Sequence, residues 1–353
     1  MAETRPNIVK RVFAIRGMGQ VITVFFGIIV LGSIFGLLNP NFLSDRNMHN
    51  LLRQIAPFLI VGIGQSYVLI TGNIDLSIGS VLGMSCMISA TLMTRGVNPW
   101  LAVLLTFIPA VVTGIINGLL VARVKLPPFI ATLGTMTIAR GIAQVVNGNR
   151  NTDAIGQGAQ LFRDVFYYGR FNLFGVNFPY NTVWIALGLW LVFNFLLSRT
   201  RTGRHIYAVG SNREAAQLSG VNVTKTVVKA YTVSAFCACV AGLIQCAQGG
   251  LGTMDSGTTF ELFAVAASVI GGVSTLGGQG ILLGTIMGAC VWGIMQNGLS
   301  LANVFVAYRN ISVGIIVIIS VWADIIVRDG RSRRLRAQAE QAAASLRETT
   351  TTN

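Results

Sequence analysis

Residues 55–93 read IAPFLIVGIGQSYVLITGNIDLSIGSVLGMSCMISATLM, two apolar runs separated by a polar turn. The runs, at 55–71 and 76–93, have about the length of a membrane-spanning helix, which needs roughly 17 to 25 apolar residues. Lipid offers the backbone no hydrogen-bond partners, so a chain crosses a bilayer as helices or as a closed barrel. The stretch therefore predicts two membrane-spanning helices.

The composition of the whole chain agrees with this prediction. Of the 353 residues, 53% are hydrophobic and only 11% are charged, whereas a soluble domain is about one quarter charged. The 40 glycines are typical of membrane helices that pack closely. All five cysteines lie in or beside apolar runs, which favours packing over disulfide or metal chemistry. We predict an all-α, polytopic membrane protein.

Apolar runs of this kind recur along the chain. They predict ten spans, at roughly 20–38, 55–71, 76–93, 99–121, 128–146, 181–197, 227–247, 261–276, 280–299 and 311–327. The membrane domain then covers 20–327, with a tail at 1–19 and a second tail at 328–353. Two long segments lie between spans, a polar and aromatic loop at 147–180 and a basic loop at 198–226. The composition of the tail at 328–353 predicts disorder.

The distribution of Lys and Arg predicts the orientation. If both termini are cytoplasmic, 18 of these residues lie in cytoplasmic segments and 7 lie outside, with Arg140 inside a span. This asymmetry follows the positive-inside rule and places the loop at 198–226 in the cytoplasm and the loop at 147–180 outside. The net charge of +14 then reflects membrane orientation, and it does not indicate a nucleic-acid surface.

A weak internal similarity links the two halves of the chain. LITGNIDLSIGSVLG (69–83) resembles VIGGVSTLGGQGILLG (269–284), and GIINGLL (114–120) resembles GIMQNGLS (293–300). Duplication of two five-helix halves is one explanation, as in many transporters. Chance similarity between glycine-rich helices is the other.

Polar residues interrupt the apolar pattern at membrane depth. Asn73, Asp75 and Ser77 lie between two spans, where an interrupted helix exposes backbone groups to a water-filled pathway. The alternative is that Asp75 and Ser77 only cap the next helix. Glu261 likewise either caps the span at 261–276 or serves as an external gate or docking residue.

Four neutral amides also lie inside spans, namely Gln65, Asn117, Gln296 and Asn297. Each either bonds to a neighbouring helix or lines a route for a polyhydroxylated solute. A proton- or sodium-driven porter would usually carry a relay of acidic or histidine side chains in its membrane core, and little of that kind is found here.

No pattern of catalytic residues is present. The sequence lacks GxxxxGK[ST], so it has no phosphate loop for ATP, and its two histidines, His49 and His205, are too far apart for an HExxH zinc helix. We therefore expect no enzyme activity, no metal site and no cofactor in this chain.

The most polar segment of the chain is SRTRTGRHIYAVGSNREAAQLSGVNVTK, residues 198–225. Within it Ser211 and Asn212 can cap a short helix that carries Glu214 in its first turn and ends at Gly220. Small residues, Ala215 and Ala216, would let that helix sit closely in a groove on a partner. The alternative is a solvated, positively charged loop.

Five stretches in order resemble the permease subunits of ribose-type bacterial ABC importers, the family that takes up monosaccharides. They are FLSDRNMHNLLRQIAPFLIVGIGQSYVLITGNIDLSIGS (42–80), INGLLVARVKLPPFIATLGTM (116–136), TRTGRHIYAVGSNREAAQLSGVNV (200–223), FELFAVAASVIGGVSTLGGQGILLGTIMGA (260–289) and NGL (297–299). The resemblance covers most of residues 40–325. It departs at Leu262-Phe263-Ala264, where the family usually continues Leu-Asp-Ala, which puts the usual substrate in doubt.

The resemblance implies a ten-helix permease in the bacterial cytoplasmic membrane that works as a homodimer with a second permease copy. A separate ABC ATPase subunit would bind ATP, and a periplasmic sugar-binding protein would deliver the solute. Glu214, Ala215, Ala216 and Gly220 would then contact the ATPase as the coupling helix. The alternative from another class is an autonomous channel or secondary transporter for a small polar solute.

Overall fold

The computed structural model describes residues 18–173 and 176–309, with isolated helical positions between 311 and 326. Nine helices of the described part lie on the first nine predicted spans. They are α2 (Met18–Leu38), α3 (Asp45–Ile70), α4 (Ile78–Thr94), α5 (Pro99–Ala122), α6 (Pro128–Val145), α8 (Asn181–Arg199), α11 (Val223–Gly249), α12 (Phe260–Ile270) and α13 (Leu282–Leu301). Six of them, α2, α3, α5, α8, α11 and α13, are long and apolar enough to cross a membrane. The predicted span at 311–327 and the two tails fall largely outside the described residues.

Helix α3 starts ten residues before the predicted span at 55–71. The 3-10 turn η1 (Pro40–Leu43) leads into it, and the Ser44 side chain accepts a hydrogen bond from the Asn47 amide at 3.3 Å. Pro57 lies inside this helix, not at its start. The prediction was wrong here because hydropathy follows the apolar run, whereas the cap decides where the helix begins.

The second correction concerns α12, predicted at 261–276. It ends at Ile270, followed by Gly272 with a positive φ of 88°, and its 11 residues span only about 16 Å, half of the hydrocarbon thickness. The chain before it, residues 250–259, packs against α4, where Gly252 approaches Met87 and Ala90. Backbone without helical hydrogen bonds is tolerated at membrane depth only where protein covers it, as α4 does here.

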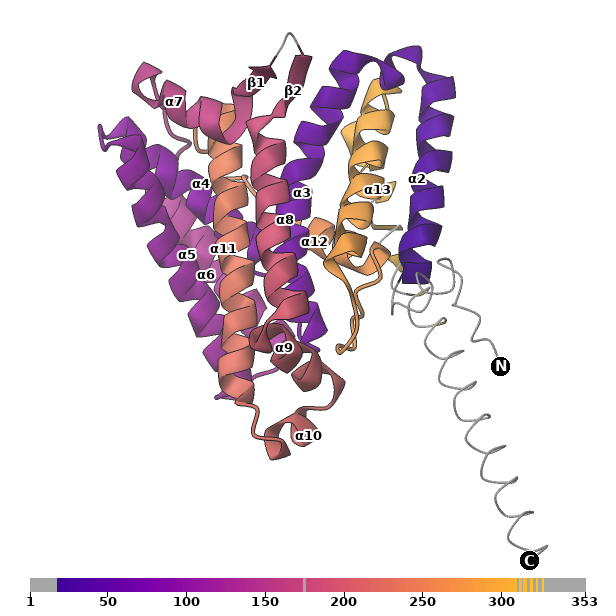
Figure 1. Ribbon diagram of the computed structural model, residues 1–353. Helices are drawn as coiled ribbons and strands as arrows, with labels where there is room; N and C mark the ends of the chain where they lie inside the picture. The colour runs from indigo at the N-terminus through magenta and orange to yellow at the C-terminus, as the bar shows by residue number, and fades with distance from the viewer. Residues whose placement is uncertain are drawn as a thin grey trace, which may run out of the picture.

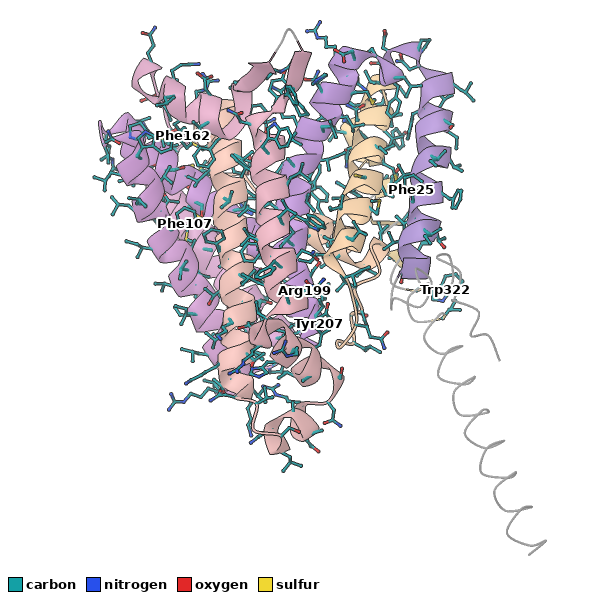
Figure 2. All side chains as sticks on the ribbon, viewed as in Figure 1. Phe25, Phe107, Phe162, Arg199, Tyr207 and Trp322 are labelled. Carbon is teal, nitrogen blue, oxygen red and sulfur yellow. The ribbon has the colours of Figure 1, made fainter. Side chains whose placement is uncertain are left out.

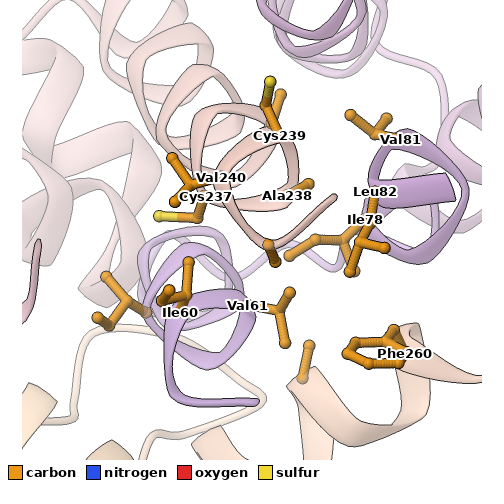
Figure 3. Packing of buried hydrophobic residues seen from close by; sticks show 14 of the residues in the cluster. Ile60, Val61, Ile78, Val81, Leu82, Cys237, Ala238, Cys239, Val240 and Phe260 are labelled. Atoms are coloured by element: carbon orange, nitrogen blue, oxygen red, sulfur yellow. The ribbon is translucent and has the colours of Figure 1, made fainter. Parts of the chain in front are cut away.

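Helices α3 and α11 form the centre of the bundle (Figure 1). Their most apolar windows are 83% and 72% buried, against 11% for α2 and 28% for α8. Figure 3 shows Ile60 of α3 on the side of Cys237 of α11 and Val61 on the side of Phe260 of α12, with Ile78 and Leu82 of α4 nearby. The peripheral helices expose apolar side chains, as a surface facing lipid does.

The two ends of the bundle carry different structures (Figure 1). At one end the predicted loop at 147–180 contains the turn η2 (Gln157–Ala159), the helices α7 (Gln160–Arg163) and η3 (Asp164–Tyr168), and an antiparallel hairpin of β1 (Arg170–Leu173) and β2 (Val176–Tyr180). At the other end α9 (Arg201–Ser211) and α10 (Arg213–Leu218) replace the predicted loop at 198–226. The bundle is all-α as expected, and the two-stranded hairpin is an addition to it.

Close packing of α3 against α11 depends on Gly64. A Cβ added there would lie 2.8 Å from the Ser234 Cα, so Gly64→Ala forces the two central helices apart. We expect this variant to lose about 1–3 kcal/mol of stability by overpacking, measured by thermal unfolding in detergent. Gly134→Ala on α6 is the matched control, because a Cβ there meets nothing within 4 Å. Equal unfolding temperatures for the two variants would contradict this packing.

Candidate functional site

Helix α10 carries the residues that the sequence predicts to dock on a partner. Asn212 caps it, with its side chain accepting a hydrogen bond from the Ala215 amide at 2.9 Å, and Glu214 lies in the first turn. Gly220 follows the helix with a φ of 81°, and it faces open space, because a Cβ added there would meet nothing within 4 Å. Ala216 is buried, whereas Glu214 and Ala215 are exposed. Ser211, predicted as a cap, is instead the last residue of α9.

The tip of α10 also presents a residue that the sequence analysis missed. Leu218 is 90% exposed, the highest value among the large hydrophobic side chains of the described part of the chain. It lies at the end of the bundle farthest from the hairpin, where Figure 1 shows α10 projecting below the spans. A large apolar side chain held in water by a short capped helix is typical of a contact with another protein.

Helix α9 connects α10 to the ends of the membrane helices. Gly210 lies against the Ile70 carbonyl oxygen at the end of α3, so closely that a Cβ would clash with it. The Gly278 amide donates to the same carbonyl at 2.8 Å, and the Tyr207 hydroxyl donates to the Gly280 carbonyl at 2.6 Å (Figure 2). Burial raises the pKa of Tyr207 to about 12, so at neutral pH this hydroxyl keeps the proton that it donates. Helix α9 therefore contacts both Ile70, the last residue of α3, and the turn at 271–281.

A cavity of about 870 Å³ opens beside α10. Glu214 lies on its wall with three basic residues, Arg123, Lys125 and Arg213, and Asn73 also lines it. Asn73 donates to the Thr71 hydroxyl at 2.7 Å. The cavity thus brings together a predicted docking residue and a predicted pathway residue.

A buried network surrounds Asp75 in the turn between α3 and α4. Its carboxylate accepts hydrogen bonds from the Ser77 amide (2.9 Å), the Ser77 hydroxyl (2.6 Å) and, on the other oxygen, the Ser234 hydroxyl of α11 (2.7 Å). Asn117 of α5 donates to Ser77 at 2.9 Å and accepts from Thr135 of α6 at 2.7 Å. Asp75 is only 2% exposed, and the network joins four segments of the bundle, namely the turn between α3 and α4 and the helices α5, α6 and α11.

These hydrogen bonds support a structural role for three of the predicted pathway residues, Asp75, Ser77 and Asn117. Asp75 accepts the Ser77 amide just before α4, which resembles the predicted cap, but its third bond reaches across to another helix. Ser77 and Asn117 are equally buried and are bonded to each other. A fully buried charge is tolerated only with such partners.

The two adjacent amides on α13 have separate surroundings. Asn297 and Asn47 of α3 exchange hydrogen bonds at 2.9 and 3.1 Å, and Asn297 also donates to Gln54 at 3.3 Å. Asn297 therefore joins α13 to α3, which agrees with the first of the two alternatives given for it, a bond to a neighbouring helix. Gln296 instead lines a cavity at the hairpin end of the bundle. Gln65 is completely buried in α3, and neither atom of its amide has a hydrogen-bond partner.

Glu261 lies in the first turn of α12 and faces the first turn of α4, where its carboxylate is close to Gly79. Both helix N-termini favour a negative charge at this place. A cavity of about 430 Å³ includes Glu261 with Arg140 and Gln144 of α6. Arg140 donates to the carbonyls of Met254 and Ser256 at 3.1 and 2.8 Å and so holds the non-helical segment before α12. The sequence signal for Arg140 was its position near the middle of the apolar span predicted at 128–146.

Within the described residues, no group of three or more His, Cys, Asp and Glu side chains is placed to hold a metal ion. The described residues instead form a short exposed helix, α10, a second helix, α9, packed on the ends of the spans, and polar cavities at both ends of a helical bundle. This arrangement fits the movement of a solute better than a chemical reaction.

Comparison with known proteins gives matches over most of the chain. Residues 47–321 match a family described as branched-chain amino acid transport system / permease component. The chain is 38% identical to the ribose import permease protein RbsC of Bacillus subtilis over 311 residues, which are 87% of this chain and 94% of that protein. It is 34% identical to the D-allose transport system permease protein AlsC of Escherichia coli, over 86% and 91% of the two chains. It is also 34% identical to the fructose import permease protein FrcC of Rhizobium meliloti, over 87% and 84%. No solved structure gives a significant match.

Removing one bond from the Asp75 network tests its contribution to stability. Ser234→Ala deletes the bond from α11 to the Asp75 carboxylate, and hydrogen bonds to charged groups contribute about 1.5–3 kcal/mol. We expect a loss of that size in thermal unfolding of the purified protein. Ser198→Ala is the control, because Ser198 is exposed and bonds within its own helix. A Ser234→Ala protein as stable as the control would show that the network adds little.

Proposed function

The chain belongs to the family of branched-chain amino acid transport system permease components, and we propose that it is the membrane-spanning subunit of an ATP-driven ABC importer for a monosaccharide or related small polar solute. One observation carries this proposal, the match to a ribose import permease over nearly the full length of both chains. The family description mentions amino acids, but the allose and fructose permeases that the chain also matches are named for sugars. The relatives are transporters, and the family is not one of enzymes.

The missing phosphate loop supports a division of labour between subunits. A separate ABC ATPase binds ATP, and a periplasmic sugar-binding protein delivers the solute to the permease, which lies in the bacterial inner membrane. Two copies of the permease form the transporter, with ten spans each and both termini in the cytoplasm. The end of the bundle that carries α9 and α10 then faces the cytoplasm, and the hairpin end faces the periplasm.

Glu214, Ala215, Ala216 and Gly220 contact the ATPase in this proposal, and Leu218 adds an apolar side chain to the same surface. When the ATPase moves α10, α9 transmits the displacement, because Gly210 contacts Ile70 just before the turn at 71–77 and Tyr207 bonds to Gly280 in the turn at 271–281. Those turns begin α4 and α13, so the movement changes how these helices pack around the solute. The cytoplasmic cavity, which the predicted pathway residue Asn73 lines, then opens or closes.

Duplication of two five-helix halves is part of the same proposal. In five-helix halves the fourth span, α5, corresponds to the ninth, α13, and these two helices carry the similar stretches 114–120 and 293–300. Repeats of this kind are common in transporters with a central site.

Reconstitution separates this function from an autonomous channel or secondary transporter. Liposomes that contain the permease, the ATPase and the binding protein should accumulate labelled sugar only when ATP is supplied on the ATPase side. Sugar flux through the permease alone, with neither partner present, would refute the importer and favour the alternative.

Two substitutions on α10 test the coupling surface. Leu218→Asp places a charge in the proposed apolar contact, and Glu214→Lys reverses the charge in the first turn of the helix. We expect each to lower ATP hydrolysis stimulated by the binding protein by about tenfold, because losing an interface contact commonly costs about 1.4 kcal/mol or more. Membrane insertion and unfolding temperature should not change, since both side chains are exposed.

The control for the first substitution is Ser219→Asp, which adds the same charge at the next exposed position. If it lowers stimulated hydrolysis as much as Leu218→Asp does, the effect is a general one of charge, and Leu218 is not a specific contact.

A further inference from the structure

A cavity of about 390 Å³ lies at the hairpin end of the bundle, between α3, α11, α12 and α13. This size is within the range of small-molecule sites, roughly 300 to 1,000 Å³. Gln296 lines this cavity. Its neighbour Asn297 instead bonds to Asn47 and so joins α13 to α3. Nothing in the docking and coupling scheme above requires a cavity here.

Three aromatic rings form an apolar side of this cavity. Phe58 of α3 lies 5.4 Å from Phe260 and 5.3 Å from Phe263 of α12, measured between ring centroids. Trp292 of α13 packs behind Phe263 at 4.7 Å and fixes its position. Residue 263 is one of the positions where this chain departs from the family pattern that it resembles. The departure replaces an expected carboxylate with part of an aromatic surface.

Four glutamines supply the polar side, namely Gln54, Gln245, Gln248 and Gln296. An amide offers two donors and an acceptor without a charge, which suits hydroxyl groups that both donate and accept. The Gln245 side-chain oxygen has no hydrogen-bond partner, and a buried acceptor is rarely left so. None of the described residues that line this cavity is acidic, and two of them, Arg53 and Arg309, are basic and can donate further hydrogen bonds to hydroxyl groups.

A cationic and aromatic cluster covers the cavity on the hairpin side. The Arg53 guanidinium lies 4.5 Å from the Tyr167 ring and 4.1 Å from the Tyr180 ring, and its Nη2 donates to Asn50 at 3.0 Å. Arg53 and Tyr167 both line the cavity. Stacking of this kind holds the arginine in place at the mouth of the site.

We propose that this cavity is a binding site for a neutral, polyhydroxylated solute of monosaccharide size, and that it lies within one protomer. The glutamines bond to the hydroxyls, and the phenylalanine rings contact the apolar face of the sugar ring. The inference rests on the proposed function and adds to it the place where solute enters from the periplasm. The rival location is the cavity of Arg140, Gln144 and Glu261, which has one glutamine in its wall where this cavity has four.

Cysteine labelling tests whether the cavity is reached from outside, and it needs no knowledge of the solute. In liposomes with the hairpin end outward, a membrane-impermeant maleimide should label Gln296→Cys. The matched control is Ile294→Cys, two residues away on the same helix and buried, which should stay at the level of the wild-type protein with its own cysteines. Absence of labelling at position 296 would overturn the proposal.

Transport by the complete importer tests the chemistry of the site. With D-ribose, D-allose, D-fructose and D-galactose as probes, Gln296→Leu and Gln245→Leu should each raise the sugar concentration for half-maximal uptake about two- to tenfold, the effect of losing one neutral hydrogen bond.

Gln144→Leu is the control for these variants, since it makes the same chemical change in the rival cavity. If Gln144→Leu weakens uptake and the other two do not, the site lies in the rival cavity and the proposal is wrong. Failure of the wild-type importer to carry any of the four sugars would instead count against the proposed function, whereas labelling at position 296 decides access to the cavity by itself.

Discussion

The architecture depends on one buried carboxylate. Asp75 sits where the chain leaves α3 and enters α4, in a bundle that otherwise offers apolar surroundings, and an uncompensated charge there would be costly. Three hydrogen bonds, two from Ser77 and one from Ser234, satisfy it. Ser77 also accepts a hydrogen bond from Asn117, and Asn117 accepts one from Thr135. The same network therefore positions α5, α6 and α11 around the turn between α3 and α4. The interruption between two spans is thus a defined joint.

The same joint is where the arm formed by α9 and α10 contacts the bundle. Gly210 and Gly277 lie so close to the backbones of Ile70 and Gly72 that a side chain at either position would separate them. Their contact means that α9 cannot move without displacing the turn at 71–77 or the turn at 271–281. Hydrogen-bonded networks and closely packed backbones have a few discrete arrangements and do not deform continuously. This favours switching of the bundle between two conformations.

Polar cavities lie at both ends of the bundle, and Asn73 and Gln296 face different ones. Between them the centre is filled by apolar side chains of α3, α4 and α11 (Figure 3) and by the short helix α12. A solute that entered at the hairpin end would therefore meet a closed path in this conformation. Alternating access requires such closure, because a pathway open at both ends would let the gradient dissipate.

The sequence by itself determined the class of protein, the approximate places of nine helices and the short helix α10 with its Asn212 cap, because hydropathy, charge and capping are local properties. It also predicted which polar residues lie at membrane depth, but not which neighbours each of them contacts. Only the tertiary structure decided that Asp75 and Asn117 belong to one network, that Asn297 joins helices while its neighbour Gln296 lines a cavity, and that Arg140 holds a non-helical segment. The half-length of α12 and the exposure of Leu218 also came from the fold. The physical reason is that burial and hydrogen-bond partners depend on which helices come together, and one sequence pattern is compatible with several such arrangements.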